Sequence, residues 1–375
     1  MRIGIPTEVR PGETRVAVTP DTIKKLTAGG MHSVVVQSGA GAGASILDAD
    51  LQAAGATIAA GASDVYSQAE LLLKVRGPDP SELAMLTPGT IVIGLLSPHD
   101  AAGVTALAAR GVVGFALERL PRITRAQAMD VLSSQANIAG YKAVMVAANE
   151  YRRFMPMLMT AAGTVKAARV LVLGVGVAGL QAIATAKRLG AVIEAFDVRP
   201  AVKEQVESLG AKFVEVPISA EEKAQAETVG GYARQMSDDY QRRQAALIDE
   251  RARVADIIIS TALIPGRPAP VLIREETVRM MKPGSVIVDL AVEQGGNCPL
   301  SERDRVVVKH GVTLVGHTNL PAMLAADASA LYARNVLSFV NLLVDPKSGA
   351  LTLNRSDEII AGALVCIDGA AVSPS

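Results

Sequence analysis

Residues 169–197, RVLVLGVGVAGLQAIATAKRLGAVIEAFD, decide the fold expected of this chain. An apolar run over 170–173 leads into a glycine turn, GVGVAG at 174–179, and a helical pattern then precedes a second apolar run that ends in Asp197. The order strand, glycine-rich turn, helix, strand and acid is typical of the nucleotide-binding half of a doubly wound parallel sheet. A tight turn in a non-binding α/β unit is the alternative, and the flanking strand, helix and acid argue against it.

Each glycine of this turn has its own physical role. Gly174 allows the chain to turn tightly, Gly176 lets the backbone approach a pyrophosphate, and Gly179 lets the helix pack closely on the strand. The helix N-terminus adds N–H groups and the positive end of a dipole. Asp197 follows Gly179 by 18 residues, close to the separation of about 20 expected for a carboxylate that binds an adenosine ribose. Arg199 could meet a 2′-phosphate, but Asp197 would repel one, so NAD(H) is favoured over NADP(H).

Length and charge restrict the class of protein. The 375 residues exceed what one hydrophobic core usually supports, so two domains are expected. Lys plus Arg and Asp plus Glu number 37 each, and aromatic residues make up 3% of the chain, with no Trp. Neither a basic surface nor a set of base-stacking side chains is expected, which argues against a nucleic-acid partner.

Hydropathy and cysteine content predict neither a membrane span nor a disulfide framework. The longest uncharged run, 170–186, has 17 residues and contains Gln181 and three glycines, whereas a spanning helix needs about 18 apolar residues or more. Cys298 and Cys366 are too few for a disulfide framework or a metal cluster, so a reducing compartment and no metal site are expected. The chain opens on a strand pattern without a signal peptide.

The N-terminal region of the chain alternates strand and helix patterns, which predicts a parallel sheet. A helix is expected after Thr19 and Pro20, which suit a helix cap and a first turn. The tail, 349–370, resembles a hairpin or paired strands that complete this domain, so the domain is expected to be discontinuous, 1–133 plus 330–375. Strands are expected at 2–6, 32–41, 70–76, 89–98 and within 112–122.

The second domain, 134–329, is predicted to bind the nucleotide. Its six expected strands match the number and order of the doubly wound dinucleotide fold. The expected fold class is therefore α/β, with two Rossmann-like, doubly wound parallel-sheet domains joined by long helices. A charged connection, 217–253, separates the third and fourth strands, and such long connections are either functional or surface excursions. The six strands are expected at 170–174, 191–197, 212–216, 256–262, 285–291 and 312–316.

Four local features could carry chemistry beside the glycine turn. The loop 121–130 is expected beside a cleft between the domains, where its two Arg, Gln and Asp could contact the nicotinamide end of a cofactor; a helix cap with surface charges is the alternative. The loops after the last three strands hold Leu263, Glu293 and His317. The backbone at Leu263 could touch the cofactor. Glu293 could be an acid/base group or merely solvated, and His317 a proton-transfer group or a structural residue.

Histidine is scarce, with four residues in the chain. A dehydrogenase that acts on a hydroxy or amino acid needs a general acid/base in its cleft. Direct hydride transfer between two nicotinamides needs instead that the rings approach to about 3–3.5 Å with water excluded. The shortage of acid/base candidates favours the second chemistry.

Long stretches of the chain resemble the NAD(H)-binding component (domain I) of proton-translocating nicotinamide nucleotide transhydrogenase. They include RIGIPTEVRPGETRVAVTP, LPRITRAQAMDVLSSQANIAGYKAV, DVRPAVKEQVESLGAKF, GGYARQM, TALIPGRPAPVLI, MKPGSVIVDLAVEQGGNCPLSE and GHTNLPAMLAADASALYARN. The resemblance implies a homodimer that binds NAD(H) and passes hydride directly to NADP(H) bound on a separate component. A membrane-spanning component would couple this step to proton movement. The implied location is the cytoplasm, at the inner membrane through the partner subunits.

The resemblance also implies which residues form the site. Gln127, Asp130 and Arg122 are expected nearest the reacting rings, and Gln127 resembles the residue placed beside them. Gly231 and Tyr232 fall on a loop expected to close over the nucleotide. The cofactor residues expected as a whole are Arg122, Ile123, Thr124, Arg125, Gln127, Asp130, Ser133, Gly174, Gly176, Val177, Gly179, Asp197, Val198, Arg199, Gly231, Tyr232, Gln244 and Leu263.

Alanine dehydrogenase shares several of these motifs and is the alternative function. Arg15 and Lys74 match the substrate-binding Arg and Lys of that family. The segment that carries a His in that family reads IVIGLL here, at 91–96, and Glu293 stands where that family uses an Asp. Many transhydrogenase α chains continue into transmembrane helices, whereas this chain ends at Ser375, as expected of a separate soluble subunit or of an excised piece.

Overall fold

The computed structural model describes residues 1–216, 238–263, 266–345 and 347–373. These residues form two compact units, unit 1 with residues 1–135 and 321–375 and unit 2 with residues 136–320. The sequence predicted the boundaries at 133/134 and 329/330. The chain passes from unit 1 to unit 2 within a long helix, α6 (Val131–Tyr151), and returns within a short 3₁₀ turn, Leu320–Leu324.

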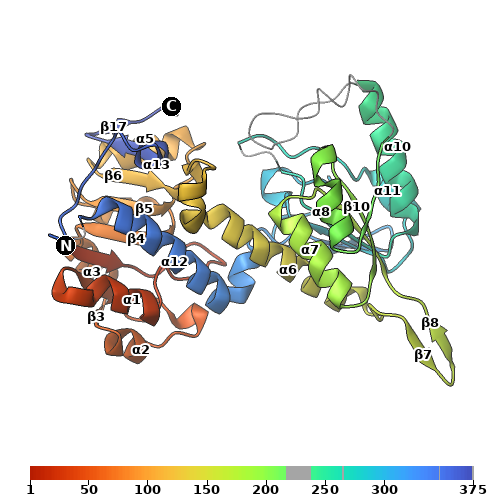
Figure 1. The fold of residues 1–375 in the computed structure, drawn as a ribbon, viewed down its shortest axis with the longest axis horizontal. Helices are drawn as coiled ribbons and strands as arrows, with labels where there is room; N and C mark the ends of the chain where they lie inside the picture. The colour runs from red at the N-terminus through yellow and green to blue at the C-terminus, as the bar shows by residue number, and fades with distance from the viewer. Residues whose placement is uncertain (217–237, 264–265, 346, 374–375) are drawn as a thin grey trace. The chain divides into compact units, whose positions relative to one another are not determined.

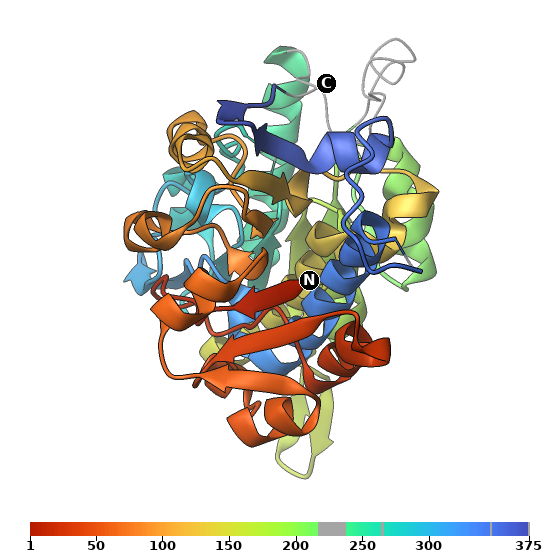
Figure 2. The same cartoon turned by 90° about the vertical axis from the view of Figure 1, so that its left-hand side faces the viewer.

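Unit 1 is built on an eight-stranded sheet in the order β17-β16-β6-β5-β4-β1-β2-β3. Strands β1 to β6 are parallel, as predicted, whereas the tail adds β16 and β17 in antiparallel pairing. Figure 2 shows β1 to β3 side by side at the red end of the colour bar. The strands are β1 (Arg2–Ile5), β2 (Ser33–Gln37), β3 (Ala56–Ala59), β4 (Leu71–Arg76), β5 (Ile91–Leu95), β6 (Val113–Ala116), β16 (Leu364–Ile367) and β17 (Ala370–Ala371).

Helices cover both faces of this sheet. Alternate residues of the strands point to opposite faces, and they divide accordingly between two hydrophobic clusters, with Leu71 and Leu73 in one and Leu72 in the other. Helix α1 begins as the sequence predicted, because Thr19 accepts a hydrogen bond from the Thr22 backbone and Pro20 occupies the first turn. The helices are α1 (Pro20–Thr27), α2 (Asp48–Ala53), α3 (Ala62–Gln68), α4 (Pro80–Met85), α5 (Ala101–Ala109), α12 (Ala325–Leu343) and α13 (Glu358–Ala363).

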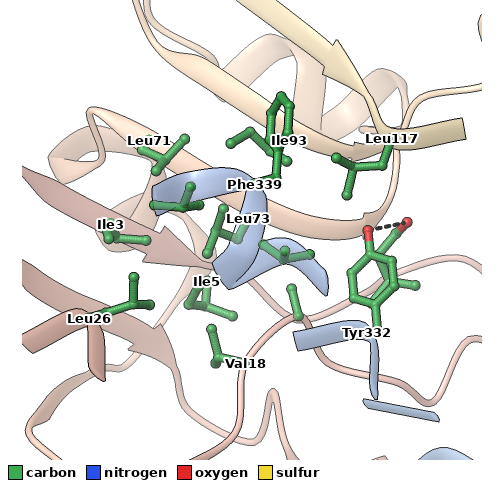
Figure 3. Packing of buried hydrophobic residues seen from close by; sticks show 14 of the residues in the cluster. Ile3, Ile5, Val18, Leu26, Leu71, Leu73, Ile93, Leu117, Tyr332 and Phe339 are labelled. Atoms are coloured by element: carbon green, nitrogen blue, oxygen red, sulfur yellow. Dashed lines mark hydrogen bonds between the residues drawn. The ribbon is translucent and has the colours of Figure 1, made fainter. Parts of the chain in front are cut away.

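Helix α12 closes one face of the unit 1 sheet (Figure 3). Its Phe339 meets Phe115 of β6 edge to face, with ring centroids 5.4 Å apart. The buried Tyr332 donates its hydroxyl hydrogen to the carbonyl oxygen of Lys74 at 2.7 Å. Burying one such aromatic or aliphatic side chain contributes about 1.5–3 kcal/mol, so the returning segment is an integral part of the unit 1 core.

Unit 2 is built on a seven-stranded sheet in the order β11-β10-β9-β12-β13-β15-β14 (Figure 1). The six predicted strands are all present, in the doubly wound order and parallel, so the predicted fold class is confirmed. Sequence reasoning missed the antiparallel edge strand β14 and a separate hairpin, β7 with β8. The strands are β7 (Leu158–Thr160), β8 (Gly163–Val165), β9 (Arg169–Leu173), β10 (Val192–Phe196), β11 (Lys212–Phe213), β12 (Ile257–Ser260), β13 (Val286–Asp289), β14 (Val306–Lys309) and β15 (Val312–Val315).

The helices of unit 2 and the second half of α6 enclose this sheet. Both faces of the sheet are apolar, since successive residues of β9, Val170 and Leu171, lie in different clusters. This explains why its strands appear as continuous apolar runs in the sequence. None of the helices within the described ranges is both long and apolar enough to cross a membrane. Besides α6, the helices are α7 (Val177–Arg188), α8 (Lys203–Ser208), α10 (Asp238–Val254) and α11 (Glu275–Met280).

Candidate nucleotide-binding site

The glycine turn connects β9 to α7 at the carboxyl edge of the unit 2 sheet. Gly174 has a φ of +88°, a region that L side chains rarely adopt, and its N–H donates to the Phe196 carbonyl oxygen at 2.9 Å. A Cβ at Gly179 would lie 2.1 Å from the Gly174 carbonyl oxygen, so any side chain there would separate the helix from the turn. The turn therefore requires glycine at both positions for reasons internal to the protein.

Gly176 differs from these two glycines. It caps α7 with an ordinary φ of −83°, and a Cβ built on it would have no protein atom within 4 Å. Neither strain nor packing demands glycine there. Its backbone is exposed, as is the following Val177, which is 40% exposed. The space above Gly176 fits the close approach of a ligand backbone such as a pyrophosphate.

The first turn of α7 presents its dipole without competition from the protein. No side chain caps the helix, and its first turn contains no acidic residue. The N–H groups of that turn and the positive end of the helix dipole together favour an anion. The chain passes unusually close to this turn on its other side, because a Cβ at Gly140 of α6 would lie 2.1 Å from the Ala178 carbonyl oxygen. Sequence reasoning missed this role of Gly140, whose only signal was a glycine in a helix interior.

Asp197 lies at the end of β10 and contacts the glycine turn directly. Its Oδ2 accepts from the Val175 N–H at 2.7 Å and from Arg199 Nη2 at 2.8 Å. Its Oδ1 accepts from the backbone N–H and from Nε of Arg199, both at 2.9 Å. A carboxylate offers about four acceptor positions, and these four bonds take them all. Arg199 therefore balances the charge of Asp197, and a ribose diol would bond to this carboxylate by taking over positions that Arg199 holds.

The loop after β12 also reaches the glycine turn. Thr261 donates from Oγ1 to the Gly174 carbonyl oxygen at 2.9 Å, and its N–H donates to the Leu173 carbonyl oxygen at 2.7 Å. Leu263, expected to contact the cofactor, is 39% exposed beyond this anchor. The carboxyl ends of β9, β10 and β12 thus bring the glycine turn, Asp197 and the 261–263 loop together, as the doubly wound fold requires.

Unit 1 contains the predicted nicotinamide-end residues, in a 3₁₀ turn over Thr124–Met129 and the first turn of α6. Asp130 caps that helix, since its Oδ1 accepts from the Ser133 N–H at 2.9 Å and its Oδ2 from the Ser133 hydroxyl at 2.5 Å. Arg125 forms a bidentate pair with Asp357, at 2.6 and 2.8 Å. That pair raises the pKa of Arg125 and lowers the pKa of Asp357. The cap predicted as the alternative is therefore present.

The remaining predicted residues are distributed over both units. Arg122, Thr124 and Gln127 are exposed, and Ile123 is half-buried. Val198 and Gln244, the latter on α10, are also half-buried. Gly231 and Tyr232 lie outside the described residues.

The acid/base candidates are weakly placed for proton transfer. Glu293 is exposed and its carboxylate lies 3.5 Å from Arg303, while His317 is half-buried. Burial raises the pKa of each cysteine, Cys298 and Cys366, to about 11, which leaves both as unreactive thiols. Within the described part of the chain, no group of His, Cys, Asp or Glu residues could hold a metal ion.

The carboxyl edge of the unit 1 sheet carries a buried ion cluster. Arg15 is 2% exposed and binds Glu13 through Nε and Nη2, both at 2.7 Å, while its Nη1 donates to Gln135 Oε1 at 2.7 Å. Arg76 Nε also contacts Glu13, at 3.3 Å. The guanidinium of Arg15 is thus bonded through all three nitrogens to other side chains of unit 1.

Lys74 forms the second half of this cluster. Its ammonium lies 2.6 Å from Glu82 Oε1 and 3.6 Å from Glu8 Oε2, and its side chain is fully buried. Tyr66 donates its hydroxyl hydrogen to Glu82 at 2.8 Å. Burial raises the pKa of Glu8, although Lys74 and two backbone N–H groups oppose the shift. Both cations that match the substrate-binding pair of alanine dehydrogenase are therefore balanced by carboxylates of this chain.

Comparisons with known proteins were made for the whole chain. The alanine dehydrogenase/PNT N-terminal domain matches residues 4–139, and the alanine dehydrogenase/PNT C-terminal domain matches residues 143–374. An NAD(P) transhydrogenase subunit alpha protein of Rhodospirillum rubrum is 54% identical over 100% of this chain and 98% of its own length. The solved structure of a transhydrogenase from Sinorhizobium meliloti superposes with a TM-score of 0.86 at 45% identity, covering 100% of this chain and 99% of that one. Alanine dehydrogenase of Mycolicibacterium smegmatis is 31% identical over 100% of this chain and 95% of its own length.

Proposed function

The chain belongs to the alanine dehydrogenase/PNT family, and within that family we propose that it is the NAD(H)-binding component of a proton-translocating NAD(P) transhydrogenase. One observation carries the choice: unit 2 has an open glycine turn at its carboxyl edge, whereas the Arg15 and Lys74 side chains of unit 1 are balanced by internal carboxylates. The greater identity to transhydrogenase alpha subunits than to alanine dehydrogenase, 54% against 31%, supports the same choice.

The glycine turn would hold the pyrophosphate of NAD(H). Gly176 offers the open approach, and the N-terminus of α7 supplies N–H groups and a favourable dipole. Asp197 would accept hydrogen bonds from the adenosine ribose as Arg199 releases some of its bonds to the carboxylate. The 261–263 loop would border the bound nucleotide, and the 122–133 segment would bind its nicotinamide end, as the resemblance implies.

The bound dinucleotide supplies the redox chemistry. NADH gives a hydride, with its electron pair, to NADP⁺ on the partner component, so that NAD⁺ and NADPH result without a proton transfer in this chain. The residues of this chain need only bind, orient and shield NADH. The absence of a well-placed acid/base group in the described part of unit 2 agrees with that requirement, since Glu293 is exposed and paired with Arg303.

Further subunits complete the proposed enzyme. The relatives are named as alpha subunits, a name that implies other subunits. We expect this chain to be a homodimer that docks an NADP(H)-binding component and a membrane-spanning component. It would then lie on the cytoplasmic side of the inner membrane, where the membrane component couples hydride transfer to proton translocation.

The decisive experiment mixes the protein with an NADP-binding transhydrogenase component and follows reduction of an NADP⁺ analogue by NADH in a single turnover. We expect hydride transfer that depends on both proteins. Gln127→Asn should slow this step far more than it weakens NADH binding, measured by calorimetry on the same samples. Reduction of NAD⁺ by alanine without a partner, together with no transfer to the NADP⁺ analogue, would establish the alanine dehydrogenase alternative instead.

A further inference from the structure

Asn297 lies at the centre of the carboxyl edge of unit 2, and no reasoning from sequence motifs assigned it a role. It follows Gly295 and Gly296 in the loop after β13 and is fully buried. Its Oδ1 accepts from the Ser260 hydroxyl at 2.6 Å and from the Ala262 N–H at 3.2 Å. Its Nδ2 donates to two carbonyl oxygens, those of Ala262 and Pro270, both at 2.8 Å.

This arrangement uses the full hydrogen-bonding capacity of one amide. The two donors of Nδ2 face carbonyl oxygens, and the two acceptor positions of Oδ1 face a hydroxyl and an N–H, so only this orientation of the amide satisfies the site. Ala262 is held at both its N–H and its carbonyl oxygen. Asn297 thereby fixes the backbone of the 261–263 loop as a neighbouring strand would.

Side chains link Asn297 to the glycine turn and to β13. Asp289, at the end of β13, accepts from the Asn297 N–H at 3.1 Å and the Cys298 N–H at 3.0 Å. On the other side of the loop, Thr261 donates to the Gly174 carbonyl oxygen at 2.9 Å. The carboxyl ends of β13, β12 and β9 are neighbours in the sheet, and these bonds join them in that order, with Asn297 as the middle connection.

We propose that Asn297 is a positioning residue for NAD(H) binding. It sets the backbone of residues 261–263 against the glycine turn and does not itself contact the nucleotide. The inference rests on the proposed function, since it concerns the same nucleotide site. It predicts that affinity for NADH depends on a fully buried amide, through the Ala262 and Thr261 backbone.

Two substitutions interrupt this connection at different places. Asn297→Asp keeps the shape of the side chain but turns an acceptor oxygen toward the carbonyls of Ala262 and Pro270. Thr261→Val is isosteric and removes the single bond to Gly174, so it tests the same connection where Asn297→Asp does not fold. The control is Ser285→Ala, in the same sheet. Ser285 is 2% exposed and donates to the Lys282 carbonyl oxygen at 2.7 Å, at the opposite end of β13.

The measurements are the Kd for NADH by calorimetry, the Tm of each variant, and KM and kcat for hydride transfer with the NADP-binding component. We expect Asn297→Asp to raise Kd and KM at least about tenfold and Thr261→Val to raise both by a smaller factor. The kcat at saturating NADH should stay within about twofold, because the loop affects binding and not the reacting rings. Ser285→Ala should lower Tm and leave Kd unchanged.

Two results would overturn the inference: an unchanged Kd in Thr261→Val and in any folded Asn297→Asp, or an equal rise in Kd in Ser285→Ala. The proposed function is judged separately. If the unaltered protein itself shows no NADH binding, the proposed function fails before any variant is compared.

Discussion

The two parallel sheets of this chain reverse their strand order at equivalent points, between β1 and β4 in unit 1 and between β9 and β12 in unit 2. At such points the carboxyl ends of the strands diverge and ligands usually bind. In unit 2 the point carries a glycine turn with open space above Gly176. In unit 1 it carries Arg15, Lys74 and Arg76, matched by Glu8, Glu13 and Glu82.

This difference teaches that the fold fixes where a ligand can bind, whereas the side chains decide whether one does. Three cations and three carboxylates within unit 1 balance one another, so an anionic substrate would have to displace a bonded carboxylate. In unit 2 the turn leaves backbone N–H groups and a helix dipole for the ligand. We expect substitutions at the unit 1 edge to affect stability and those at the unit 2 edge to affect NADH binding.

Lys74→Met should have the largest effect on stability. Removing one partner of a buried ion pair leaves carboxylates uncompensated and costs about 3–5 kcal/mol, here because Glu82 and Glu8 both face Lys74. Urea unfolding measures the loss, and the Kd for NADH should not change in the folded fraction. Lys25→Met is the control, since Lys25 pairs with Asp21 on an exposed face of unit 1 and its loss should not alter stability measurably. A loss of NADH affinity in Lys74→Met would break the separation between the two edges.

Gly176→Ala should have the largest effect on binding. The added methyl would meet no protein atom within 4 Å, but it would occupy the space proposed for the pyrophosphate. We expect the Kd for NADH to rise at least about a hundredfold, with a change in stability of roughly 0.5 kcal/mol or less. Gly61→Ala is matched to it, because Gly61 caps α3 of unit 1 and a Cβ there also meets nothing. Equal NADH affinities in the two variants would remove the pyrophosphate from Gly176.

Asp197→Asn should have the next effect on binding. Losing a charged acceptor for the ribose costs on the order of 1.5–3 kcal/mol of binding free energy. Calorimetry with NADH measures the loss. Asp256→Asn is the control in the same sheet, because Asp256 accepts from the Arg169 N–H and from Lys282, both at 2.8 Å, at the opposite edge. It should lower stability without changing the Kd. Unchanged affinity in Asp197→Asn would limit Asp197 to ordering the turn through Val175 and Arg199.

The pH dependence of stability should be the smallest effect and should arise in unit 1. Burial raises the pKa of Glu118 above its ordinary 4.5, despite opposing hydrogen bonds from its own N–H and those of Ser97 and Leu96. Because the folded-state pKa exceeds the unfolded value, this stability is complete below 4.5 and is lost as pH rises through the folded-state pKa. One proton gives a slope of at most about 1.4 kcal/mol per pH unit.

Glu118→Gln should flatten this slope, because the amide does not ionise. Urea unfolding at a series of pH values from about 5 to 8 measures it. The Kd for NADH should show no matching change between the variant and the unaltered protein. A slope that persists in Glu118→Gln would assign the pH dependence to Glu8, whose pKa burial also raises.

The sequence predicted much of the fold because the signals are local. A glycine turn between two apolar runs specifies a strand, a turn and a helix within 29 residues, 169–197. The alternation of such runs then gives the parallel order of both sheets. It did not reveal β14 or the β7–β8 hairpin, because short exposed strands such as Val306–Lys309 show little apolar periodicity.

The candidate site was predicted less completely than the fold. Spacing alone suggested Asp197 as a ribose ligand and Arg199 as a possible phosphate ligand, but their mutual pairing at 2.8–2.9 Å appears only in the structure. Asn297 gave no signal, since its partners Ser260 and Ala262 lie more than 30 residues away in the chain. Hydrogen bonds between distant segments leave no periodic pattern in the sequence.

The sequence by itself determined that the chain forms two doubly wound units and that one of them has a glycine turn suited to a dinucleotide. Those features follow from backbone conformation and apolar periodicity, which neighbouring residues specify. Only the tertiary structure decided that Arg15 and Lys74 are balanced by Glu13 and Glu82, and that Gly176 lies under open space. Whether a charge is available or a space is open depends on what the fold brings within a few ångströms, and local sequence does not contain that information.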